Sequence, residues 1–171
     1  MSVPPIPLTQ CDSSTPGTRP PQCNSGDSIE LVGLAALPTA IPLVRSFARA
    51  KLSAWGLEAD HGWECRQVLS ELVTNAFDVT GEPLHRDLLA LDELAVILIQ
   101  LRISAKKLIV EVRDSASGRP QIPDTGLNDE GGRGLRLATM LAGEWGWYPV
   151  TTPTPGKVVW ASWALDRKVA S

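Results

Sequence analysis

Three polar motifs in this chain carry residue types suited to phosphate and metal chemistry. Glu71 and Asn75 lie four residues apart in a stretch with helical spacing of apolar residues, so both fall on one face of the expected helix. Asp114 ends an apolar run that is typical of a β-strand. The glycine-rich segment 131–134 directly precedes a second helical pattern. In this order and spacing, the three motifs predict an ATP site.

Each motif can supply one part of such a site. The Asn75 side-chain oxygen can ligate Mg²⁺ without adding negative charge beside a polyphosphate. Glu71 is placed to accept a proton from an attacking water or hydroxyl group. Asp114 can accept a hydrogen bond from the adenine amino group. The sequence therefore offers a metal ligand, a general base and a partner for the base.

The glycine-rich segment can supply the contacts to phosphate. Gly132 and Gly134 let the backbone approach a phosphate closely, and the N-terminus of the following helix favours anions. Arg133 adds a side chain that can contact the same phosphates.

Each motif alone has a simpler interpretation. Glu71 and Asn75 could form the solvated face of an amphipathic helix, although Asn is unfavourable in a helix interior. Asp114 could be a turn residue at a strand end, and the glycines could belong to an ordinary turn. The combination of all three favours the ATP site over these readings.

The remaining sequence predicts the elements that position these residues. We expect strands over 29–37, 94–103, 108–112, 144–150 and 157–165, and helices over 39–55, 61–79 and 132–142. The short link 104–107 predicts a hairpin turn, so the strands expected over 94–103 and 108–112 should pair antiparallel. The helix over 61–79 presents one apolar arc: Val68, Leu69, Leu72, Val73, Ala76 and Val79. The fold class predicted is α/β (α+β): a two-layer sandwich with a mixed, largely antiparallel sheet and helices on one face.

Length and composition bound the function. A chain of 171 residues with a formal net charge of −3 suits one domain, over 28–171, and argues against nucleic-acid binding. No apolar run approaches the roughly 20 residues that span a bilayer, and no signal-peptide pattern opens the chain, so we expect a cytoplasmic protein without membrane contact. Residues 1–27 are rich in Pro, Ser and Thr and are expected to be a disordered tail or a docking peptide.

Two common nucleotide motifs and a cysteine framework are absent from the sequence. It has no Walker glycine–lysine loop and no dinucleotide fingerprint after the first strand. Its three cysteines, Cys11, Cys23 and Cys65, lack zinc-ligand spacing and are expected to be free thiols.

The motifs together resemble the GHKL ATPase superfamily, which includes gyrases, heat-shock chaperones and histidine kinases. They are most similar to the anti-sigma-factor serine/threonine kinases and their short actinobacterial relatives. The resemblance covers about residues 29–166 and is carried by five segments: 44–52, 71–76, 108–114, 131–135 and 156–160.

The resemblance implies a role for each matching residue. Glu71 would be the catalytic base and Asn75 the magnesium ligand of the N box. Asp114 would read adenine, and segment 115–131 would be the ATP lid. Four residues of the second glycine box would bind the phosphates, and a later glycine of the first box would complete the site: Gly132, Arg133, Gly134, Leu135 and Gly118.

Two positions depart from the family pattern. Ala116 stands where the first glycine of Asp-x-Gly-x-Gly is usual, and its Cβ restricts φ and lies near the expected base position. Val158 stands where many relatives carry Thr, so one hydrogen bond on the adenine side is expected to be missing.

Two functions follow as expectations. The first is an ATP- and Mg²⁺-dependent serine/threonine protein kinase that switches between a sigma factor and an anti-anti-sigma (antagonist) partner. The second is a catalytically weak or nucleotide-independent partner-binding module of the same fold. A sensor histidine kinase fits less well, because no hairpin carries a phospho-acceptor His. A homodimer is expected. Four tryptophans in the last two expected strands are expected mostly in the core, and one that is exposed would suit an interface: Trp145, Trp147, Trp160 and Trp163.

Overall fold

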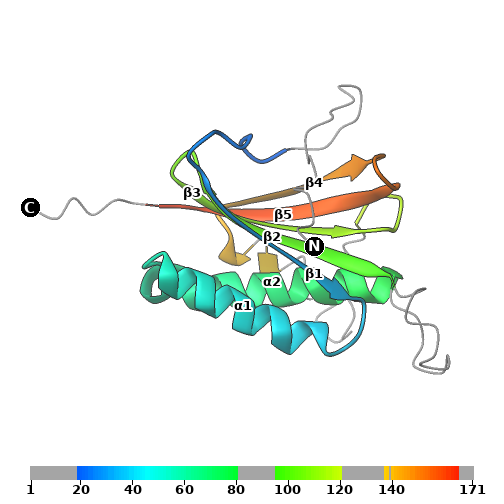
Figure 1. Ribbon diagram of the computed structural model, residues 1–171, viewed down its shortest axis with the longest axis horizontal. Helices are drawn as coiled ribbons and strands as arrows, with labels where there is room; N and C mark the ends of the chain where they lie inside the picture. The colour runs from blue at the N-terminus through cyan, green and yellow to red at the C-terminus, as the bar shows by residue number, and fades with distance from the viewer. Residues whose placement is uncertain (1–18, 81–94, 121–136, 139, 166–171) are drawn as a thin grey trace, which may run out of the picture.

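The computed structural model describes residues 19–80, 95–120, 137–138 and 140–165. Its described elements follow the order β1 (Ser28–Ala35), α1 (Ala40–Ala54), α2 (Glu58–Thr80), β2 (Val96–Ser104), β3 (Lys107–Asp114), β4 (Glu144–Val150) and β5 (Gly156–Ala164). Figure 1 shows α1 and α2 side by side on one face of a single sheet. The predicted two-layer α+β sandwich is therefore confirmed.

The sheet has five strands in the order β1-β2-β3-β5-β4, and every neighbouring pair is antiparallel. The predicted hairpin joins β2 to β3 through Ala105 and Lys106, whose φ angles are 50° and 59°. Two consecutive positive φ angles are the geometry of a tight turn that matches the twist of the paired strands. The turn fixes the register of β2 against β3, and the separate β3–β5 ladder brings Asp114 opposite Lys157.

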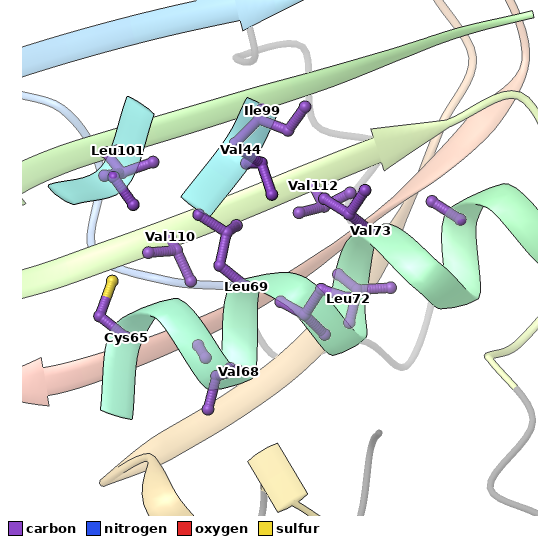
Figure 2. Close-up of a cluster of buried hydrophobic side chains, with 14 of the residues drawn as sticks. Val44, Cys65, Val68, Leu69, Leu72, Val73, Ile99, Leu101, Val110 and Val112 are labelled. Carbon is purple, nitrogen blue, oxygen red and sulfur yellow. The ribbon is translucent and has the colours of Figure 1, made fainter. Parts of the chain in front are cut away.

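The core lies between the two helices and the sheet. Val44, Ala48 and Leu52 on α1 recur at helical spacing and are fully buried. Figure 2 shows Leu69 and Val73 of α2 directed toward the side chains of β3. The predicted apolar arc of α2 is confirmed for its first five members and wrong for Val79, which is 55% exposed. The helix therefore leaves the core before its last turn.

The helix predicted over 132–142 is described only in part. Residues 137, 138, 140 and 141 are helical, whereas its start lies outside the described residues. Trp163 of β5 donates its indole N–H to the Leu141 carbonyl oxygen at 2.7 Å, and Ala138 is fully buried. Trp163 and Trp160 are buried, and Trp145 and Trp147 pack partly buried against the core, as expected for most of the tryptophans.

Residues 19–27 of the expected N-terminal tail lie on the face of the sheet opposite the helices (Figure 1). The Arg19 guanidinium stacks over the Tyr148 ring at 4.5 Å from its centroid, and the Ser104 hydroxyl donates to the Gln22 carbonyl oxygen at 3.1 Å. This part of the segment is thus attached to the domain. Residues 1–18 lie outside the described residues. No described helix is long and apolar enough to cross a membrane.

Gly156, the first residue of β5, is required by a close approach of two backbones. A Cβ at this position would lie 2.1 Å from the Asp114 carbonyl oxygen, a distance that only a backbone shift can relieve. At Gly143 a Cβ would meet the Ser162 carbonyl oxygen at 3.4 Å, an ordinary contact.

We therefore predict that Gly156→Ala lowers the free energy of unfolding by about 1–3 kcal/mol, because it overpacks the end of the β3–β5 ladder. Urea denaturation followed by circular dichroism measures the change. Gly143→Ala is the matched control and is expected to stay within about 0.5 kcal/mol of the parent. Equal stabilities of the two variants would contradict the close approach.

Candidate functional site

A cleft of about 350 Å³ lies between the C-terminal half of α2 and the ends of β3 and β5. Its volume falls in the range of small-molecule sites, about 300–1,000 Å³. Apolar side chains form one part of its lining, and a few polar groups converge on the same space. The lining residues are Leu72, Asn75, Ala76, Asp78, Val79, Val112, Asp114, Ala116, Ser117, Arg119, Pro120, Lys157 and Val159.

Asn75 faces this cleft from α2, four residues after Glu71. Its side-chain nitrogen is buried and has no hydrogen-bond partner among the described residues. A buried amide left without a partner costs about 1–3 kcal/mol, so native structures seldom retain one without a reason. The unpaired side-chain nitrogen leaves Asn75 with a donor for a group that enters the cleft, such as a phosphate oxygen.

Asp114 enters the cleft from the end of β3 and is only 3% exposed. Its Oδ1 accepts two hydrogen bonds, from the Ala116 backbone N–H at 2.9 Å and from the Lys157 ammonium at 2.8 Å. Burial raises the pKa of the Asp114 carboxyl, while both interactions of Lys157 and the Ala116 N–H act in the opposite direction. Lys157 therefore offsets part of the cost of burying a carboxylate here.

Ala116 does not strain the backbone at the position where relatives carry glycine. Among the described non-glycine residues, only Ala105 and Lys106 have a positive φ. Ala116 instead uses its backbone N–H to cap Asp114, as in an Asx turn. Of the two effects expected of alanine at this position, the restriction of φ causes no strain. The remaining effect is the space that its methyl group takes in the cleft lining. Gly118, two residues later, has a φ of +107° and occupies a conformation that favours glycine.

The alternation of β5 decides which of its side chains reach the cleft. Lys157 and Val159 line the cleft, whereas Val158 lies on the other face, packed with Tyr148 and Trp160. The expectation that Val158 removes a hydrogen bond on the adenine side is therefore wrong, because its side chain does not face that side. Lys157 was not identified as a site residue from the sequence. The signal that identifies it is the β3–β5 register, which places Lys157 opposite Asp114.

The structure brings some of the predicted site residues together and leaves others apart. Asn75 and Asp114 share the cleft. Glu71 is partly exposed one turn earlier on α2 and is not part of the lining. Gly118 directly follows the lining residue Ser117. Four predicted phosphate-binding residues and most of the expected lid, 121–131, lie outside the described residues: Gly132, Arg133, Gly134 and Leu135.

A second cavity of about 500 Å³ lies on the opposite face of the sheet, beneath residues 19–23. Its charged side chains largely bind one another. Arg102 donates to Glu111 at 2.8 Å, and Tyr148 donates to the other oxygen of the same carboxylate at 3.1 Å. None of the residues predicted to form the site lines this cavity. The smaller cleft is therefore the better candidate.

Comparison with known families agrees with this architecture. A model described as the histidine kinase-like ATPase domain matches residues 34–163. Comparison with curated proteins gave no match. The matched region begins in β1, ends in β5 and includes both helices and the whole cleft. On this match over most of its length, the chain belongs to the family of histidine kinase-like ATPase domains.

Proposed function

We propose that this protein binds ATP with Mg²⁺ in the cleft between α2, β3 and β5. The observation that carries the proposal is the convergence of Asn75, whose buried side-chain nitrogen is unpaired among the described residues, and the buried carboxylate of Asp114 in one cleft. The apolar lining suits the faces of a purine, and in this proposal Asn75 supplies the metal ligand and Asp114 the partner of the base.

The donor set fits magnesium. Mg²⁺ usually takes one or two protein oxygens and completes its shell with phosphates and water. The described residues contain no group of three or more His, Cys, Asp or Glu side chains that could hold a metal by themselves. Asn75 would be the protein ligand, and the ion would neutralise phosphate charge. The phosphate contacts proposed for Gly132, Gly134 and Arg133, and a nearby role for Leu135, rest on the family resemblance.

The proposed reaction is serine/threonine phosphorylation of a protein partner. Glu71 accepts the proton of the serine or threonine hydroxyl while the hydroxyl oxygen bonds to the γ-phosphorus of ATP. The bond between that phosphorus and the oxygen that bridges to the β-phosphate breaks at the same time, and ADP is released. Two features support this role. Glu71 lies one helical turn from Asn75, and its partial exposure leaves it accessible to a second protein.

The proposed biological context is partner switching. An antagonist of the anti-anti-sigma type would be the phosphorylated protein, and a sigma factor the alternative partner, in the cytoplasm. A homodimer is part of the same proposal. These assignments rest on the resemblance of the chain to anti-sigma-factor kinases.

One observation favours the alternative, a partner-binding module with weak or no catalysis. Two donors already occupy Oδ1 of Asp114, and Ala116, with a methyl group where relatives carry glycine, lines the cleft beside it. Both features reduce the room and the hydrogen-bonding capacity offered to a base. Calorimetric titration with ATP, with and without Mg²⁺, tests the nucleotide-independent form of this alternative, which requires that no magnesium-dependent binding occurs. If ATP binds, the phosphotransfer assay separates a kinase from a catalytically weak module.

We predict that Asn75→Ala abolishes magnesium-dependent ATP binding while the domain stays folded, because the variant removes the metal ligand and leaves the core intact. Isothermal titration calorimetry measures the affinity, and circular dichroism checks the fold. Gln67→Ala, on the same helix but outside the cleft, is the control and should bind like the parent. Unchanged affinity in Asn75→Ala would remove this residue from the site.

We further predict that Glu71→Ala retains ATP binding and loses phosphotransfer by about 10²–10⁴-fold, the usual contribution of a general base. Transfer of radiolabelled γ-phosphate to a cognate partner protein provides the measurement. Glu64→Ala changes a partly exposed acid two turns earlier on α2 and should leave transfer unchanged. Full activity of Glu71→Ala would exclude the residue as the base.

A further inference from the structure

Lys157 is a buried cation inside the candidate nucleotide cleft. Its side chain is 7% exposed, and that of its partner Asp114 is 2% exposed. The ammonium donates to Asp114 Oδ1 at 2.8 Å and lies 3.4 Å from the Ala116 carbonyl oxygen. Burying a lysine ammonium costs a large desolvation free energy, so a buried lysine beside this carboxylate is not explained by a role in solubility.

The pair leaves one acceptor and one donor for a ligand. Oδ1 of Asp114 already accepts from the Lys157 ammonium and from the Ala116 N–H, which fills its two lone-pair sites. No hydrogen bond from another described residue reaches Oδ2. An ammonium has three N–H donors, and two of those of Lys157 are used. The cleft therefore presents one carboxylate oxygen beside one ammonium N–H.

We propose that Lys157 sets the base selectivity of the cleft, a role that depends on the proposed ATP binding. Adenine presents an amino donor beside the N1 acceptor along one edge. The amino group can donate to Asp114 Oδ2 while the Lys157 ammonium donates to N1. The pair thus reads both groups of this edge, whereas Asp114 alone would read only the amino group.

The same pair disfavours guanine. Guanine presents the O6 acceptor and the N1–H donor at the two positions where adenine presents its amino donor and the N1 acceptor. In the placement proposed for adenine, O6 would face Asp114 Oδ2, which opposes two acceptors, and N1–H would face the Lys157 ammonium, which opposes two donors. Without Lys157, the carboxylate could instead accept from the guanine N1–H and 2-amino groups. A site whose polar groups remain unpaired with the wrong ligand discriminates strongly. Lys157 therefore acts as a specificity-determining residue toward adenine nucleotides.

The test removes the N1 acceptor from the base and, separately, the ammonium group of Lys157 from the protein. Calorimetric titration of the full chain with Mg²⁺ uses four ligands: ATP, GTP, 1-deaza-ATP, which lacks the N1 acceptor, and 7-deaza-ATP as the matched analogue. Wild-type protein should bind 1-deaza-ATP at least about tenfold more weakly than ATP and GTP at least about 100-fold more weakly. The affinity for 7-deaza-ATP should stay within about threefold of that for ATP, because position 7 takes no part in the pairing.

In Lys157→Met the difference between ATP and 1-deaza-ATP should disappear, and the preference for ATP over GTP should fall below about tenfold. If the variant does not fold by circular dichroism, the wild-type series decides alone. Equal affinities of the wild type for ATP and 1-deaza-ATP, or an unchanged difference in Lys157→Met, would overturn the role of Lys157 and leave ATP binding standing. Absence of binding by every nucleotide would overturn both.

Discussion

The packing of α2 against β3 and β5 is the interaction on which the candidate site depends. Leu69, Leu72 and Val73 bury one face of the helix, and this burial fixes its rotation about its own axis. Once the rotation is fixed, Asn75 must face the cleft, because it lies three residues after Leu72. The last turn leaves the core, and Val79 becomes a wall of the cleft. The site thus occupies the region where helix and sheet diverge.

The strict alternation of the strands gives the sheet two different faces. Toward the helices, β3 presents Val110 and Val112 and ends in Asp114. Toward the other face it presents Glu111, which binds Arg102 and Tyr148 beneath residues 19–23. The same rule separates Lys157 from Val158 on β5. A shift of one residue in register would exchange these groups, so the register of the β3–β5 ladder is itself part of the site.

Periodicity predicted most of the fold because its elements bury one face each. The helix that carries Asn75, the hairpin before β3 and the position of Asp114 at a strand end all follow from local patterns. What escaped prediction depends on pairing between distant segments. The approach of Lys157 to Asp114 requires the β3–β5 register, and the attachment of Arg19 requires the position of Tyr148 across the sheet. No local signal in the sequence encodes either contact, and Val79 was misplaced because the apolar pattern of α2 continues beyond the end of its core.

Two buried ion pairs show why one region of this sheet is structural and the other is suited to binding. Glu111 accepts hydrogen bonds at both carboxylate oxygens, from Arg102 and from Tyr148, so it has no vacant oxygen to offer. Asp114 receives both of its donors at one oxygen, although it is equally buried. The second oxygen of Asp114 accepts from no other described residue, so it can accept a donor that a ligand brings into the cleft. The asymmetry of its hydrogen bonds, more than its charge, distinguishes Asp114 as a binding group.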